Sequence, residues 1–136
     1  MSLRDDMVKV LARDSRYPIQ AYAFIYETIE YTRRLKDRAR ARKLKSKTIA
    51  ARKHITGQEL CEGAKRLALR DYGLMAETVL AQWGLRSTSD LGDVVYNLIA
   101  SGDLEKTDED NRSDFDDVFD LPKVLREGHN FILDPA

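Results

Sequence analysis

The sequence predicts a mainly helical α+β domain, in which three helices and a small β-hairpin form the core and further helices precede them. Two observations predict the helices: apolar residues recur at intervals of three and four, and several glycines and prolines fall at the ends of these stretches. The hairpin is predicted because a polar, turn-like segment, residues 108–114, separates a possible strand at residues 104–107 from residues 115–121, which return the chain to the core.

Residues 1–53 predict two N-terminal helices. The first is a short helix near residues 7–11. The second follows Pro18, a residue type common in the first turn of a helix. Its apolar stripe consists of Ile19, Tyr22, Ala23, Tyr26, Ile29 and Leu35. This helix is predicted to continue into the basic segment, residues 33–53, because Arg, Lys, Ala and Leu all favour helices.

A capping box at residues 56–59, Thr-Gly-Gln-Glu, predicts the start of the next helix, because its hydroxyl and carboxylate bind backbone amides that a helix start leaves unpaired. Gly73 is predicted to end this helix. A second core helix is predicted over Leu74–Trp83, and a third from about Ser87 to Gly102. The core-facing residues of the second helix are predicted to be Met75, Val79, Leu80 and Trp83. Two helices joined by a short turn with glycine are typical of a helix-turn-helix.

After the third helix, the sequence predicts the hairpin and a C-terminal unit. The first strand is predicted over residues 104–107. Residues 115–121 return the chain to the core, and their spacing fits either one helical turn or a short strand. A last helix is predicted over residues 123–127, after Pro122, and a terminal strand over residues 129–133.

A chain of 136 residues fits a single domain. We divide it into N-terminal helices (1–53), a central core (54–121), and a C-terminal helix and strand (122–136). The single cysteine, Cys61, excludes an intramolecular disulfide. No apolar stretch is long enough for a transmembrane helix, and the N-terminus has no signal-peptide pattern. The expected location is therefore the cytoplasm, without a membrane partner.

Helix, helix, turn, helix and hairpin is the element order of a winged-helix domain, and residues 56–121 resemble one. Within them, LIASGDLEKT resembles the end of a third helix that passes into the first wing strand. Longer matches are AYAFIYETIEY at 21–31, HITGQELCEG at 54–63, LALRDYG at 67–73, the block at 79–121, and VLRE at 124–127. Through these segments the chain resembles an uncharacterised family of small bacterial proteins, the conserved hypothetical proteins of planctomycetes and verrucomicrobia. That family has no assigned activity, so the resemblance implies no functional residues.

The net charge of the chain is zero, but its charges are separated along the sequence. Residues 1–60 hold 15 Lys/Arg and 7 Asp/Glu, whereas residues 61–136 hold 8 and 16. The basic segment contains 11 cations and one acid, and residues 103–120 contain nine acids and two bases. Such an asymmetry indicates a charged partner.

The acidic side chains fall where a winged-helix domain contacts DNA, and they disfavour DNA binding there because carboxylates repel phosphates. We predict instead a protein-interaction or self-association role, in which this surface contacts a protein partner or the basic segment of a second copy. The predicted acidic partner surface consists of Asp90, Asp93, Asp108, Glu109, Asp110, Asp114 and Asp116.

The alternative function is sequence-independent nucleic-acid binding by the basic segment, because a dense run of cations neutralises phosphates. The predicted contact residues, for nucleic acid or for a protein partner, are Arg33, Arg34, Lys36, Arg38, Arg40, Arg42, Lys43, Lys45 and Lys47. These positions surround a helix instead of lining one face, a pattern that a solvated run of charges also explains.

Residues with catalytic chemistry are few. Besides carboxylates, only His54, Cys61 and His129 are common nucleophile or base types, and no catalytic motif accompanies them. His54 is expected to order the turn before the capping box, and Cys61 to be a core residue, although a helix start can lower the pKa of a thiol. Residues 108–120 lack the glycine and the final glutamate of a calcium-binding loop. We therefore expect no enzyme activity, metal, cofactor or small-molecule substrate.

Overall fold

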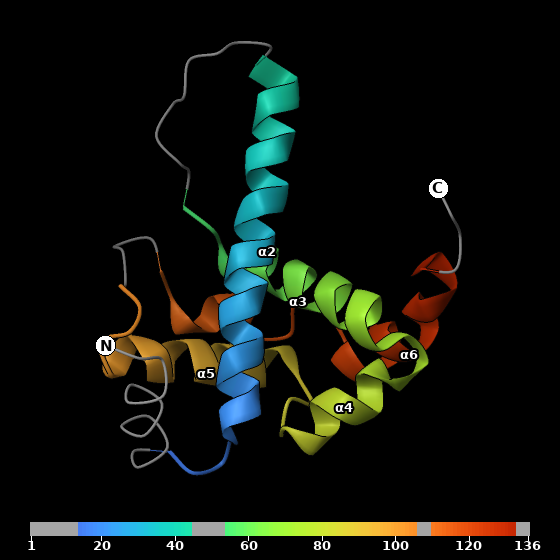
Figure 1. Ribbon diagram of the computed structural model, residues 1–136. Coiled ribbons are helices and arrows are strands. Elements are labelled where there is room, and N and C mark those ends of the chain that lie inside the picture. Colours follow the sequence, from blue (N-terminus) through green and yellow to red (C-terminus); the bar gives the residue numbers. More distant parts are fainter. Residues whose placement is uncertain (1–13, 45–53, 106–109, 133–136) are drawn as a thin grey trace.

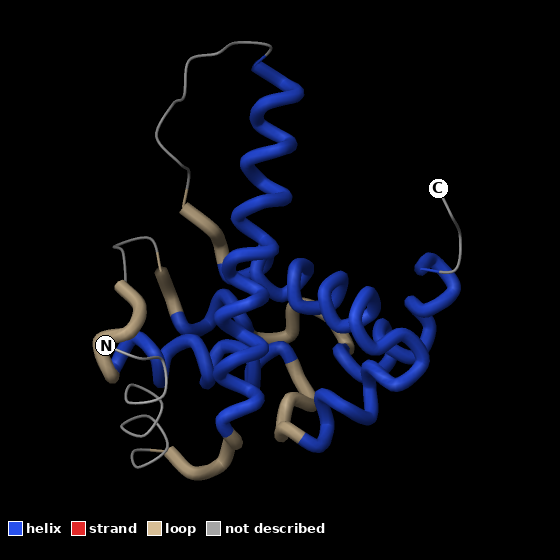
Figure 2. Tube along the Cα trace, in the orientation of Figure 1, coloured by secondary structure: helices blue, strands red, loops and turns tan. Residues whose placement is uncertain are grey.

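The computed structural model describes residues 14–44, 54–105 and 110–132, with side chains as far as residues 42 and 128 in the first and last of these ranges. The elements are α2 (Ile19–Leu44), α3 (Gly57–Tyr72), the 3₁₀ helix η1 (Gly73–Met75), α4 (Ala76–Gln82), α5 (Thr88–Ala100), the 3₁₀ helix η2 (Arg112–Phe115) and α6 (Leu121–Ile132). Figures 1 and 2 show helices and loops, and no strand is formed by the described residues. The predicted α+β class is therefore wrong.

The hairpin of the predicted winged helix is replaced by loop and 3₁₀ structure in the described residues. Leu104 and Glu105, the described part of the first predicted strand, lie in a loop. Further on, the Asn111 side chain accepts a hydrogen bond from the Asp114 amide, and the Asp114 carboxylate accepts one from the Asn111 amide at 3.3 Å. This reciprocal cap satisfies the backbone within η2, so the segment requires no neighbouring strand.

Of the two alternatives for residues 115–121, the strand is wrong. Phe115 ends η2 and is buried, and the chain then turns into α6, which begins at Leu121. Phe115 can approach α5 because Gly92 has no side chain: a Cβ at Gly92 would lie 2.6 Å from the Phe115 Cβ. The same contact fixes η2 against the middle of α5.

The predicted terminal strand is also wrong, because α6 continues to Ile132. Residue 133 lies outside the described residues. Leu121 and Leu125 are buried, and Gly128 approaches α3 so closely that a Cβ there would lie 2.7 Å from Leu69 Cδ1. Since these positions recur at intervals of three and four, continuing the helix buries them on one face.

The helix after Pro18 forms as predicted and continues into the basic segment, as α2. α2 crosses α3 where Thr32 meets Gly63, and a Cβ at Gly63 would lie only 1.9 Å from Thr32 Oγ1. On the N-terminal side of this crossing, Tyr22, Ile25 and Thr28 are fully buried. The first half of α2 therefore passes through the core of the molecule.

The capping box that begins α3 is confirmed, with Thr56 as N-cap, and so is the third core helix, which Ser87 caps. The second core helix begins later than predicted. Gly73, with a φ of 51°, ends α3, and η1 then shifts the phase of α4, so that Ala76 is buried while Met75 is 56% exposed. The other predicted core-facing residues pack against the core: Val79, Leu80 and Trp83.

The second half of α2 projects from the body of the molecule, beyond the other helices (Figure 1). None of residues 33–42 is buried, and Arg34, Arg38 and Arg42 are exposed. The short helix predicted near residues 7–11 lies outside the described residues. Within the described part of the chain, no helix is both long and apolar enough to cross a membrane.

Candidate functional site

The projecting end of α2 presents a row of arginines. Arg34, Arg38 and Arg42 are spaced four residues apart, and side chains at this spacing are neighbours on one face of a helix. We call these three residues the arginine row. Asp37 is the only acid among residues 33–44, but Glu27 and Glu30 line a hollow together with Arg34. The excess of positive charge is therefore greatest around Arg38 and Arg42.

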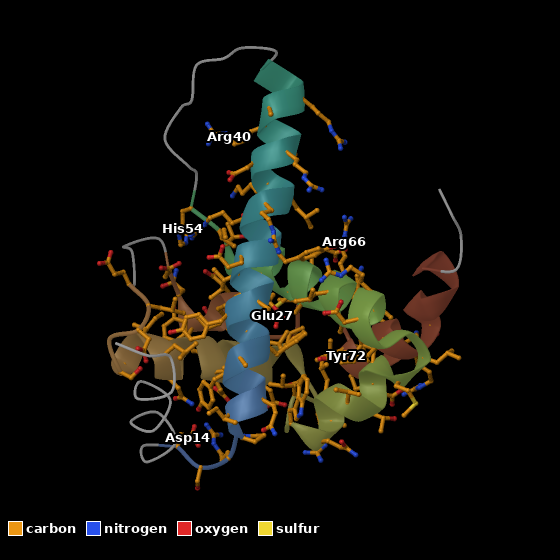
Figure 3. The ribbon with its side chains drawn as sticks, in the orientation of Figure 1. Asp14, Glu27, Arg40, His54, Arg66 and Tyr72 are labelled. Atoms are coloured by element: carbon orange, nitrogen blue, oxygen red, sulfur yellow. The ribbon has the colours of Figure 1, made fainter. Side chains whose placement is uncertain are left out.

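The other predicted cations of α2 have different positions. Lys36 Nζ donates hydrogen bonds to Glu59 Oε1 at 2.7 Å and to the His54 carbonyl at 2.6 Å, and thereby ties α2 to the start of α3. Arg33 faces a cavity beside this contact. Arg40 lies on the same side of α2 as His54 (Figure 3). The structure does not describe the side chains of Lys43, Lys45 and Lys47.

The α5 face that would read DNA in a winged helix is bound within the chain. The Tyr17 hydroxyl lies 2.8 Å from Asp90 Oδ1 and 2.9 Å from Asp93 Oδ2. Burial and these two carboxylates raise the pKa of Tyr17, which keeps its hydroxyl a donor. Asn97 Nδ2 donates to Asp14 Oδ2 at 2.8 Å. This face of α5 is therefore occupied by the segment that precedes α2.

Arg112, on η2, also binds the N-terminal part of α5. Its guanidinium donates to the Ser89 carbonyl at 2.7 Å, to the Asp93 carboxylate, and to Asp116 Oδ1 at 3.2 Å. Asp116 also accepts a hydrogen bond from Ser89 Oγ at 2.8 Å. The carboxylates of Asp93 and Asp116 thus hold η2 against α5 and are part of the fold.

The remaining described members of the predicted acidic surface also have partners. Asp110 forms an ion pair with His54 Nε2, and Asp114 is part of the η2 cap. Asp108 and Glu109 lie outside the described residues. Residue spacing could not reveal these bonds, because most partners come from distant segments of the chain. Tyr17 and Asp90, for example, are 73 positions apart.

A cavity of about 330 Å³ lies between α2, the start of α3, the end of α5 and η2. We call it the α2 cavity. Its wall is mostly apolar and includes Ile29, Ile55, Leu60, Val95, Ile99 and Phe115. Polar groups also line it: Arg33, the His54–Asp110 pair, Asn111 and Tyr96. A mostly apolar cavity with a few converging polar groups is the usual form of a ligand site.

Tyr96 contributes an unsatisfied polar atom to this wall. Its hydroxyl is buried and has no hydrogen-bond partner among the described residues. Burial, followed by the nearby carboxylates of Asp110 and Asp114, raises the pKa of Tyr96. The hydroxyl therefore stays protonated near neutral pH and can donate a hydrogen bond.

A larger hollow of about 610 Å³ lies between α3 and α6 and has cations at its rim. These cations are largely compensated, because Glu62 Oε1 lies 2.8 Å from Lys65 Nζ and 3.3 Å from Arg66 Nε. Figure 3 shows Arg66 and His54 on opposite sides of α2. Because the cations of this hollow are compensated by Glu62, the projecting end of α2 and the α2 cavity are the stronger candidates for function.

Cys61 does not have the environment of a nucleophile. It is fully buried, and burial raises the pKa of its thiol to about 12, against the weaker lowering effect of Arg112. The prediction of a core cysteine is thus confirmed. His54 binds Asp110, while the side chain of His129 is not described. Within the described residues, no group of three or more His, Cys, Asp or Glu side chains could hold a metal ion.

Comparison with family models, curated proteins and solved structures gives no significant match. The resemblance to the planctomycete and verrucomicrobial family therefore stays a prediction. The features that bear on function are the arginine row and the α2 cavity.

Proposed function

We propose that the projecting end of α2 binds nucleic acid through its phosphates, without reading the base sequence. The observation that carries this proposal is the arginine row, which is exposed on a half-helix that extends beyond the other described helices. Around Arg38 and Arg42 few carboxylates compete for the guanidinium groups, since Asp37 is the only acid in residues 33–44.

The physical basis is the neutralisation of phosphates by cations, which releases condensed counterions and supplies most of the affinity in non-specific binding. Residues four positions apart rise about 6 Å along a helix axis. The arginine row therefore extends over about 12 Å, which is long enough to contact several phosphates. Arginine is well suited to this role because its planar guanidinium can donate two parallel hydrogen bonds to one phosphate.

The competing hypothesis, in which the basic segment pairs with the acidic surface of a protein partner or second copy, has less support. Each described carboxylate of that surface already binds a group of its own chain, for example Asp93 with Arg112 and Asp110 with His54. An intermolecular pair would have to replace these bonds. We therefore rank nucleic-acid binding first, and the protein-interaction role stays a prediction.

The test is binding of fluorescently labelled oligonucleotides, measured by anisotropy at several salt concentrations between about 50 and about 200 mM. The double variant Arg38→Gln/Arg42→Gln should bind much more weakly at low salt. Its plot of log affinity against log salt should be shallower by about two, one for each lost phosphate contact. The matched control is Arg86→Gln/Lys123→Gln, which removes two exposed cations away from α2 and should bind nearly as the wild type does.

Equal losses in the two double variants would contradict a site on α2. Absence of binding at about 50 mM salt would end the proposal. If that absence came with an oligomer that dissociates as salt increases, the result would favour charge pairing between copies of the chain.

A further inference from the structure

The α2 cavity lies beside the projecting end of α2, on the side of the helix that carries Arg33. We infer that this cavity receives one unpaired base of the strand whose phosphates α2 binds. The inference rests on the proposed function and makes it more specific, because an unpaired base is offered only by single-stranded nucleic acid or by a loop.

The volume and the wall of the cavity fit a nucleobase. An apolar cavity of about 150 Å³ can hold benzene, so the α2 cavity, at about 330 Å³, has room for a two-ring base. Its branched aliphatic wall includes Ile29, Val95 and Ile99, and Phe115 and Tyr96 add aromatic surface. Apolar and aromatic surface of this kind favours the flat faces of a base, whatever its identity.

The polar groups of the cavity suit the edge of a base better than an anion. Asp110 and Asp114 line the cavity, and both carboxylates would repel a ligand that placed a negative charge inside it. A carboxylate can accept several hydrogen bonds. These two can therefore accept from the amino group of a base in addition to their bonds with His54 and the Asn111 backbone amide. The Tyr96 hydroxyl, which lacks a partner among the described residues, and the Asn111 amide can donate to the ring nitrogens and carbonyls.

The cations lie where the phosphates of such a nucleotide would be. Arg33 lines the cavity and makes no ion pair that involves a described residue. Arg40 is two helical turns further along, on the same side of α2 as His54 (Figure 3). A strand that follows this side of α2 would meet Arg33 beside the cavity and Arg40 beyond it. The neutral base would then be enclosed, while the charged backbone stays at the surface.

Two pairs of variants test the inference. Arg33→Gln and Arg34→Gln remove the same charge from adjacent positions of α2, but Arg34 lies about 100° around the helix from Arg33 and faces away from the cavity. Ile55→Trp fills the cavity from the loop before α3, whereas Ile19→Trp makes the same exchange at a site that is 40% exposed at the start of α2. Thermal unfolding and circular dichroism establish that each variant is folded.

Binding is measured with a single-stranded oligonucleotide and with a duplex of the same sequence, both at low salt. The wild type should prefer the single strand, and Ile55→Trp should reduce that preference by about tenfold, the usual contribution of one stacked base. Ile19→Trp should leave the preference unchanged. Arg33→Gln should weaken single-strand binding more than it weakens duplex binding, whereas Arg34→Gln, which belongs to the arginine row, should weaken both to a similar extent.

Equal affinity for single strand and duplex, unaffected by Ile55→Trp, would overturn the inference but leave the proposed function standing. An equal effect of Arg33→Gln on single-strand and duplex binding would also overturn it, because simple charge neutralisation predicts that result. If neither oligonucleotide binds, both the inference and the proposed function fail.

Discussion

Arg112 and Tyr17 illustrate why individual carboxylates of this chain are hard to interpret from the sequence. Both residues bind Asp93, one from η2 and one from the segment before α2. Spacing along α5 correctly placed Asp93 away from the buried stripe, but it gave no information on which distant side chains would cover it. The acidic surface was therefore overestimated, whereas the core position of Cys61, on an apolar helical face, was predictable.

Cys61 provides a prediction at the scale of a single residue. Because burial raises the pKa of its thiol to about 12, almost no thiolate is present near pH 8. A chromogenic disulfide reagent should therefore fail to modify the folded protein at that pH and should react with one thiol per chain in denaturant. Immediate reaction of the folded protein would contradict the burial of Cys61.

Helices of this chain were predicted best where a local signal marks their ends. The Thr56 capping box and the Ser87 N-cap act within four residues of sequence, so their contribution is visible without the fold. The η1 turn was missed, and so was the η2 cap, although Asn111 and Asp114 bond each other within four residues of sequence. The position of η2 against α5 could not be predicted, because it depends on packing between distant segments. Gly92 shows this well: its role is to admit Phe115, a contact that no periodicity of α5 reveals.

The crossing of α2 and α3 gives a prediction at the scale of helix pairs. Gly63→Ala should lower the free energy of unfolding by about 1–3 kcal/mol, because the new Cβ would overlap the Thr32 side chain. In a Thr32→Ala background the same substitution should be less destabilising, since the overlapping hydroxyl is absent. Urea unfolding of the four proteins measures the difference, and additive effects within about 0.5 kcal/mol would contradict a direct contact.

For the whole molecule, the sequence revealed the separation of charge but not its consequence. Residues 33–44, the described part of the basic segment, were expected to continue the preceding helix, and they form the end of α2 that projects from the body. Of the acidic half, the described carboxylates of the predicted surface form internal bonds, which a count of charges cannot distinguish from solvent exposure. The α2 cavity was missed, because its walls come from segments that only the fold brings together.

The internal bonds predict how the stability of the whole molecule depends on pH. Several carboxyl groups have pKa values below their ordinary range: Asp14, Glu59, Glu62 and Glu77. Hydrogen bonds from Arg16 dominate at Asp14; at Glu59, burial opposes ionisation but Lys36 and the Thr56 amide outweigh it. Because the unfolded chain then binds more protons in acid, the stability that these groups provide is present above about pH 4.5 and is lost as pH falls.

Urea unfolding between neutral pH and pH 3 measures this loss. Glu59→Gln should make the decrease shallower, because one carboxyl with a lowered pKa is removed. Lys36→Met should act in the same direction, since Glu59 loses the ammonium group that favours its charged form. A stability that is constant or increases on acidification would contradict the internal bonding of these carboxylates.

The position of the α2–α3 crossing affects the affinity of any partner that binds the projecting end of α2, because it determines how much of the helix is supported by other elements. Tertiary contacts support the helix up to Lys36, which bonds to His54 and Glu59. Beyond Lys36 none of the described side chains of α2 is buried, so the helix there depends more on local helical preference. A polyanion bound to the projecting end of α2 would reduce the conformational fluctuations of this end. The conformational entropy lost in this way would offset part of the favourable binding free energy. Substitutions of the exposed Ala39 or Ala41 by glycine would then weaken association without touching a single charge.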